Sequence, residues 1–145
     1  MTDLKPTMHW DDLEEGQEIA TWTNAANEVQ LLVFSAITWN PHRIHYDRDY
    51  AHTEGHRDII VHGPLQGAWL SQYVTDWMGP LGRMKRLGWQ NRGSAVVNET
   101  VSFKGRVLRK YVEGGEHLVD GEIVEEGSDG ATLMPATFTV ALPTR

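Results

Sequence analysis

Residues 61–80 read VHGPLQGAWLSQYVTDWMGP, and the other segments of the chain are interpreted around them. Pro64 suits the first turn of a helix, and Gly79 followed by Pro80 is a stop signal. Between these positions, apolar residues cover most of the helix circumference: Leu65, Ala68, Trp69, Leu70, Tyr73, Val74, Trp77 and Met78. The pattern therefore predicts a central helix that the rest of the fold surrounds.

Strand signals flank this helix on both sides. Residues 17–23 alternate loosely and are rich in strand formers, which predicts a first strand. Glycine-containing turns then separate three long predicted strands: 94–107, 116–126 and 131–142. These strands should pair as an antiparallel meander, with Pro135 indicating an edge or a bulge. The sequence predicts an α+β fold, one sheet curled around one helix, as a single domain over residues 1–145.

A shorter helix is predicted over residues 27–37. Its apolar residues recur at helical spacing, which favours one buried face: Val29, Leu32, Val33, Ala36 and Ile37. Asn24 or Asn27 could cap its start. Pro41 disfavours a helical conformation at Asn40, so the next segment begins on a turn, and residues 49–58 are expected to form a polar loop.

Composition excludes several classes of function. The 145 residues include 13 Lys and Arg against 20 Asp and Glu, and the net charge of −7 argues against a nucleic-acid partner. The absence of cysteine excludes disulfides, thiolate metal sites and cysteine nucleophiles. No window approaches the roughly 18 apolar residues of a membrane span, so no membrane partner and a cytoplasmic location are expected.

Histidines are concentrated just before the central helix. His42, His45, His52 and His56 lie within fifteen positions, and His62 stands at the start of the helix. Imidazole titrates near neutral pH, so His45 is a candidate general base, with Asn40 as a candidate orienter of the ring or of a water molecule. The alternative is a histidine that only hydrogen-bonds the loop backbone.

A metal site is the other use for such a cluster. Histidines three or four residues apart converge on one ion only when they lie on a helix, and Pro41 makes a helix here uncertain. No metal site is therefore predicted.

Gly63 begins the central helix. Backbone N–H groups at a helix N-terminus can receive a carbonyl oxygen on which negative charge develops, and glycine allows close approach. Glycine there could equally serve only to permit a tight corner. Arg43 is either a solvated surface charge or an anion clamp, and basic residues of the second half could hold phosphates if several converge.

Two segments carry a family likeness. Residues 34–47, FSAITWNPHRIHYD, together with 61–65, VHGPL, resemble the hydratase motif of MaoC-like (R)-specific enoyl-CoA hydratases, which have the hot dog fold. The likeness is nearest to the branch that includes mesaconyl-CoA hydratases. Residues 72–80 resemble the small hydratase subunit of actinobacterial steroid side-chain degradation.

The resemblance implies a site. In that family an aspartate and a histidine five residues later hold the water that adds to an enoyl thioester, and a backbone amide at the start of the central helix stabilises the enolate oxygen. Carried over, His45 is the histidine and Gly63 the amide, whereas Asn40 occupies the aspartate position. Asn40 can orient water but cannot take its proton, so His45 would act as the base. Further substrate contacts are expected from His42, Arg43, His62 and Pro64.

The implied function is hydration of an α,β-unsaturated acyl-CoA to the 3-hydroxyacyl-CoA, or the reverse dehydration. No cofactor is expected beyond the coenzyme A of the substrate, and the partner would be a second copy or a different hot dog subunit. One alternative is a hot dog thioesterase, which needs a carboxylate near the central helix: Glu54, Asp58 or Asp76. The other is a non-catalytic acyl-CoA-binding subunit, to which Asn40 in place of aspartate points.

Overall fold

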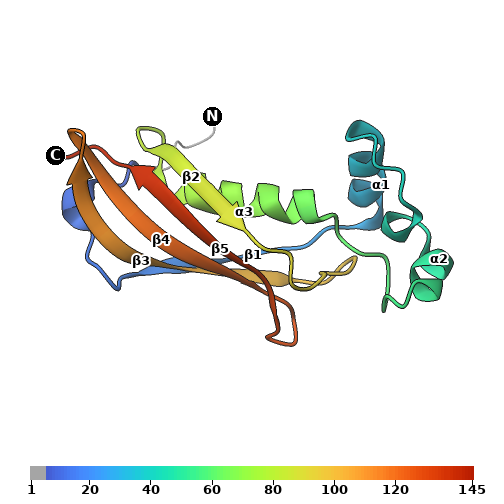
Figure 1. The fold of residues 1–145 in the computed structure, drawn as a ribbon. Helices are drawn as coiled ribbons and strands as arrows, with labels where there is room; N and C mark the ends of the chain where they lie inside the picture. Colours follow the sequence, from blue (N-terminus) through green and yellow to red (C-terminus); the bar gives the residue numbers. More distant parts are fainter. Residues whose placement is uncertain (1–5) are drawn as a thin grey trace.

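The structure is a computed structural model that describes residues 6–145. One antiparallel sheet of five strands curls around the helix α3 (Gly63–Met78), as Figure 1 shows. The strands lie in the order β1-β3-β4-β5-β2, and their bounds are β1 Glu18–Asn24, β2 Arg83–Trp89, β3 Val101–Glu113, β4 Glu116–Glu126 and β5 Thr132–Ala141. Within residues 6–145 no helix has the length and apolar character needed to cross a membrane.

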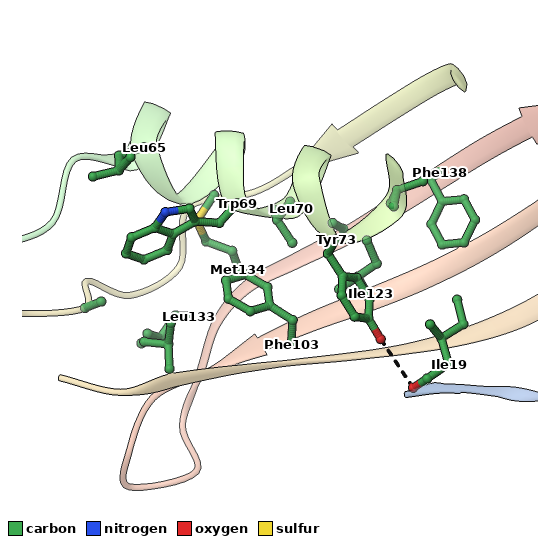
Figure 2. Packing of buried hydrophobic residues seen from close by; sticks show 14 of the residues in the cluster. Ile19, Leu65, Trp69, Leu70, Tyr73, Phe103, Ile123, Leu133, Met134 and Phe138 are labelled. Atoms are coloured by element: carbon green, nitrogen blue, oxygen red, sulfur yellow. Dashed lines mark hydrogen bonds between the residues drawn. The ribbon is translucent and has the colours of Figure 1, made fainter. Parts of the chain in front are cut away.

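The central helix has the predicted position and character. Pro64 lies in its first turn, and Gly79 ends it with a φ of 74°, a conformation that glycine adopts without steric cost. Its buried side chains pack on residues from the inner face of the sheet, such as Phe103, Ile123 and Phe138 (Figure 2). The Tyr73 hydroxyl, inside this core, donates to the carbonyl of Ala20 at 3.0 Å, so β1 is tied to the helix.

The strand predictions are confirmed in part. The bounds of β4 are those predicted, and β1 and β5 differ by only one or two residues. The third strand starts at Val101, whereas residues 94–100 form a turn and a single bridge. β2 was not predicted, because it is a charged edge strand with a register shift between Met84 and Arg86 that hides its alternation.

Pro135 was expected at an edge or a bulge. The edge interpretation is wrong, because β5 lies between β4 and β2. The last pair between β2 and β5 is Trp89 with Ala136, and Pro135 lies just beyond this pair. The Pro135 carbonyl accepts from the Gln90 N–H at 3.1 Å, past the end of β2. Its missing N–H therefore breaks no pairing with β2.

Three short elements lie beyond the end of the sheet, next to the N-terminus of α3 (Figure 1): α1 (Glu28–Ile37), the 3₁₀ turn η2 (Arg43–His45) and α2 (Arg48–Thr53). A further 3₁₀ turn, η1 (Trp10–Asp12), precedes β1. Asn27 caps α1 as predicted, with Oδ1 accepting from the Gln30 N–H at 2.9 Å. The polar loop expected over residues 49–58 is partly wrong, because α2 occupies its first half and is capped by Asp47.

The buried face predicted for residues 27–37 is also wrong. The buried residues of α1 are Leu31 and Ser35. The expected apolar side points outward, with exposed fractions between 47% and 79% for these residues: Val29, Leu32, Val33 and Ile37. Since α1 lies past the end of the sheet, it docks through its other side and leaves its most apolar side uncovered in this chain.

Gly121 tests the packing between the neighbouring strands β4 and β5. A Cβ at this position would lie 2.1 Å from Cζ of Phe138, its buried partner across β4 and β5. We expect Gly121→Ala to lower the free energy of unfolding by about 1–3 kcal/mol, because the ring must leave its rotamer or push the strands apart. Urea denaturation measures the loss.

Gly88→Ala in the edge strand is the matched control, since a Cβ there meets nothing within 4 Å. A Gly121→Ala variant as stable as Gly88→Ala would show that this packing is not tight.

Candidate active site

The turn after α1 delivers the first site residue. The N–H of Asn40 donates to the Ser35 carbonyl at 2.9 Å and that of Trp39 to Ala36 at 3.4 Å, the bonding pattern of a Schellman motif. Trp39 takes the left-handed position of this motif, with φ 52°, although glycine is usual there. Pro41 then prevents the helix from continuing. Asn40 is thus held by its backbone, and its side chain forms no hydrogen bond within residues 6–145.

His45 is buried at the end of η2, where its Nδ1 lies 2.8 Å from the Ile60 carbonyl oxygen. A carbonyl only accepts, so Nδ1 carries the hydrogen and Nε2 of the neutral ring has a free lone pair. Burial lowers the pKa of His45 below its usual value, and nearby His42 and His56 lower it further. The ring is therefore neutral near pH 7, in the tautomer of a general base.

His62 lies directly against this base. The two imidazole rings stack with centroids 3.7 Å apart and an angle of 17° between their planes. Nε2 of His62 lies 2.9 Å from Oγ of Ser35, whereas its Nδ1 is buried without a partner among residues 6–145. Burial lowers the pKa of His62 to about 4, and the neighbouring His45 contributes to this shift. His62 is therefore a neutral ring that packs His45 from one side.

Gly63 follows His62 and begins α3, so its N–H belongs to the first turn, where donors have no partner within the helix. The macrodipole of this 16-residue helix adds partial positive charge at the same end. A Cβ on Gly63 would lie 3.3 Å from Nδ2 of Asn91, so the amide of Asn91 borders the approach to this backbone. The stacked histidines bring His45 to the end of α3 that carries Gly63, as the sequence predicted.

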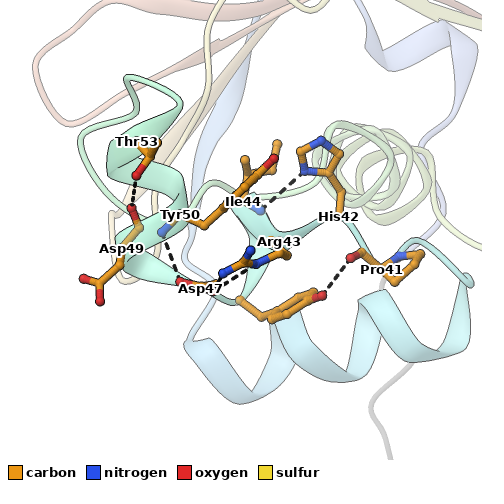
Figure 3. Close-up of polar contacts among 9 residues, drawn as sticks. Pro41, His42, Arg43, Ile44, Asp47, Asp49, Tyr50 and Thr53 are labelled. Atoms are coloured by element: carbon orange, nitrogen blue, oxygen red, sulfur yellow. Dashed lines mark hydrogen bonds and ion pairs between the residues drawn. The ribbon is translucent and has the colours of Figure 1, made fainter.

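The remaining predicted residues are placed differently. Arg43 pairs with Asp47 at 2.6 Å and lies over the Tyr50 ring, and His42 Nδ1 accepts from the Ile44 N–H (Figure 3). Pro64 is exposed in the first turn of α3. No group of three or more His, Asp or Glu side chains in the described part of the chain is arranged to hold a metal ion.

Sequence reasoning missed three groups: the Ile60 carbonyl on His45, Ser35 on His62, and Glu125 on Gln66. The Ile60 carbonyl has no signal in the sequence, because any residue supplies a carbonyl. Ser35 repeats the spacing of the buried Leu31, which could have indicated that it faces inward. Glu125 occupies an inward position of β4, two residues after Ile123, and is fully buried. A glutamate in phase with the apolar residues of a strand was the available signal.

His62 makes stability depend on pH in a defined direction. Its folded pKa of about 4 lies below the ordinary value of 6.5, so in this window the unfolded state binds a proton that the folded state does not. The stability that it contributes is present above pH 6.5 and is lost as the pH falls through 4. Between pH 7 and pH 4 we expect His62→Gln to lose up to about 3 kcal/mol less unfolding free energy than the wild type. The measurement is the unfolding free energy of both proteins across this pH range.

The control is His52→Gln, which removes an exposed imidazole from α2. If His62→Gln kept the wild-type dependence on pH, the burial of a neutral His62 would not be the cause.

Known proteins of similar sequence include two hydratases. The sequence is 36% identical over 109 residues to mesaconyl-C(4)-CoA hydratase of Chloroflexus aurantiacus, covering 74% of this chain and 35% of that protein. It is 36% identical over 64 residues to the 3-oxo-4,17-pregnadiene-20-carboxyl-CoA hydratase beta subunit of Mycobacterium tuberculosis, covering 44% of this chain and 50% of the subunit. The chain thus spans half or less of the length of these relatives.

A solved structure confirms the hot dog fold. The R-hydratase PhaJ1 from Pseudomonas aeruginosa superposes with a TM-score of 0.84 at 22% identity, covering 96% of this chain and 88% of that one. The sequence signature of the family described as hydroxyacyl-thioester dehydratase type 2 matches residues 5–97, which include the whole segment from Asn40 to Gly63. The chain therefore belongs to the hydroxyacyl-thioester dehydratase type 2 family.

Proposed function

We propose that this chain carries a hydratase site that adds water across the double bond of an α,β-unsaturated acyl-CoA thioester, or catalyses the reverse dehydration. The observation that carries the proposal is the setting of His45. Its Nδ1 is committed to the Ile60 carbonyl, and its ring stacks on the residue that precedes Gly63. A neutral imidazole with a free Nε2 beside a helix N-terminus combines a base with an acceptor for negative charge.

The reaction uses these two groups in sequence. Nε2 of His45 takes a proton from water while the water oxygen attacks Cβ; the electron pair of the Cα–Cβ double bond then forms a double bond between Cα and the carbonyl carbon, and the carbonyl π pair moves onto the carbonyl oxygen. The Gly63 N–H stabilises this enolate. When the carbonyl re-forms, Cα takes the proton from His45, and the base returns to its neutral state. Addition of water needs no redox agent, and the expectation of no cofactor besides the substrate's coenzyme A stays a prediction.

Asn40 is proposed to orient the attacking water. Its amide donates and accepts hydrogen bonds but cannot take a proton, so it contributes geometry and leaves proton transfer to His45. Substrate contacts by His42, Arg43, His62 and Pro64 stay predictions. For Arg43, a role as an anion clamp requires exchange of its ion pair with Asp47 for the substrate.

The three carboxylates named for the thioesterase alternative do not support it. Glu54 is exposed after α2, and Asp58 is paired with Arg48 at 2.8 Å. Asp76 is thirteen residues along α3 from Gly63, a distance of about 20 Å. It lines a separate groove of about 260 Å³ with Trp22 and Tyr73. The other alternative, a non-catalytic binding subunit, is favoured by Asn40 alone.

We also propose that a second hot dog subunit, a copy of this chain or a related one, completes the site. A relative of this chain is named as the beta subunit of a hydratase, which supports a partner. The exposed apolar side of α1, directly before Asn40, supports a covering surface near the site. The cytoplasmic location expected from the sequence stays a prediction.

Incubation with crotonyl-CoA, mesaconyl-CoA and a steroid enoyl-CoA tests the function. We expect loss of the enoyl absorbance with the thioester intact for at least one of them, and His45→Ala should lower turnover by about two to four orders of magnitude. Wild-type kcat/KM should fall as the pH is lowered through the depressed pKa of His45, because the base becomes protonated.

His52→Ala serves as the control histidine. Release of free thiol would instead indicate a thioesterase, and no change with any substrate would favour the binding subunit. Equal activity of His45→Ala would remove this residue from the mechanism.

Arg92 is the proposed contact for a coenzyme A phosphate. It follows Asn91, which borders Gly63, and its guanidinium is hydrogen-bonded to the neutral Gln90 side chain at 2.9 Å. By contrast, Arg83 and Lys85 both pair with Glu116. We expect Arg92→Ala to raise KM for crotonyl-CoA by about threefold to tenfold, the effect of losing one exposed charge contact, and to leave KM for crotonyl-pantetheine unchanged.

Arg83→Ala is the matched control and should change neither KM. An equal rise of both KM values in Arg92→Ala would contradict a phosphate contact.

A further inference from the structure

A buried carboxyl group lies under the first turns of α3. Glu125 on β4 is fully buried between the sheet and the helix, with Oε2 accepting from Nε2 of Gln66 at 3.2 Å and Oε1 without a partner among residues 6–145. Burial raises its pKa to about 7, and the charge of Glu99 adds to the shift. Such a group is costly to bury, and an apolar residue would pack there at lower cost. Its presence therefore calls for a use other than packing.

Gln66 links this carboxyl group to the loop that follows β2. Its side chain is buried, its Nε2 donates to Oε2 of Glu125 at 3.2 Å and to Sδ of Met134 at 3.0 Å, and its Oε1 accepts from the Ala95 N–H at 3.4 Å. An amide has distinct donor and acceptor ends, so the acceptor at Glu125 fixes which end faces Ala95. The backbone N–H of Gln66 donates to the His62 carbonyl, one turn earlier.

Ala95 in turn belongs to a short pair of segments, residues 59–61 and 95–97, that we name the base strap. The Val61 N–H donates to the Ala95 carbonyl at 2.9 Å, the Val97 N–H donates to the Ile59 carbonyl at 2.8 Å, and Ile60 bridges Val96. The Ile60 carbonyl at the centre of this strap is the acceptor for Nδ1 of His45.

The strap also has a second support. Glu99 accepts from the Val96 N–H at 2.9 Å and from the Ser128 N–H at 3.0 Å, and it pairs with Arg57. Glu99 thus holds the strap at Val96, and Gln66 with Glu125 holds it at Ala95. Neither support touches the imidazole itself.

We propose that Gln66 and Glu125 are positioning residues for His45. Together they hold residue 95 against residue 61, and so fix the Ile60 carbonyl that sets the tautomer and orientation of the imidazole. The role in catalysis rests on the proposed hydratase function, whereas the effect on the His45 ring does not. Without the acceptor at position 125, Nε2 of Gln66 keeps only the weak thioether acceptor of Met134, so the amide is held less firmly and the Ile60 carbonyl shifts with residue 95.

The test reads the His45 ring directly. Long-range ¹H–¹⁵N spectra of histidine-labelled protein report the tautomer of each imidazole, and His45 is assigned by the signal lost in His45→Ala. We expect a single Nδ1–H tautomer in the wild type and in Glu125→Gln, which keeps an acceptor oxygen. In Glu125→Leu we expect a mixture of tautomers and a kcat lowered by about tenfold to a hundredfold, with KM changed far less.

Glu122→Leu is the matched control, because it makes the same change on the outer face of β4, where Glu122 pairs with Arg106. It should leave both measurements at wild-type values. Gln66→Met keeps the side-chain volume and removes the amide, so we expect the same mixture of tautomers and the same loss of kcat as in Glu125→Leu. It replaces Glu125→Leu if that variant does not fold.

A folded Glu125→Leu or Gln66→Met with an unchanged His45 tautomer would overturn the proposal and leave Glu99 as the sufficient support. If the wild type hydrates no enoyl-CoA, the hydratase function fails, and the tautomer measurement still decides whether these residues position His45.

Discussion

The hydrogen bond from His45 Nδ1 to the Ile60 carbonyl is the interaction on which the site depends. With the bond from the Ile60 N–H to the Ile44 carbonyl, it joins the 3₁₀ turn η2 to a segment bridged to residues 95–97, and through that segment to the body of the fold. It also decides the chemistry, because the nitrogen that it leaves bare is the one that can take a proton. The same imidazole in the other tautomer would present an N–H in place of the lone pair.

The position of this bond follows from how the sheet and α3 end. The sheet covers the helix along its length, whereas α1, η2 and α2 lie beyond the sheet at the helix N-terminus (Figure 1). The histidines therefore lie in a region where backbone N–H and C=O groups are not used in pairing between the strands of the sheet. Leu31 and Ser35 dock α1 there, and Ser35 extends the contact to His62. The region is built from local turns, each fixed by a cap such as Asn27 or Asp47.

Some elements of the fold could be predicted from the sequence and others could not, for physical reasons. The central helix was predicted because its stop signals and its apolar circumference are local properties of residues 61–80. The orientation of α1 was not predicted correctly. Periodicity shows which side of a helix is apolar, but it does not show whether the same chain covers that side. β2 was missed because a charged edge strand lacks alternation. In the candidate site, His45 and Gly63 were predicted from residue type and stay predictions, whereas the carbonyl, the ring stacking and the strap arise only from tertiary contacts.

Two of the buried titratable groups, His62 and Glu125, act on stability in opposite senses. His62, with a folded pKa of about 4, stabilises the fold more as the pH rises toward 6.5, whereas Glu125, with a folded pKa of about 7, stabilises it less as the pH rises from 4.5. Over the shared interval the unfolded chain gains a proton at one group and loses one at the other, so their contributions to proton uptake offset each other. The loss of stability that His62 causes on acidification is therefore weaker with Glu125 in the interior than it would be with an apolar residue at that position.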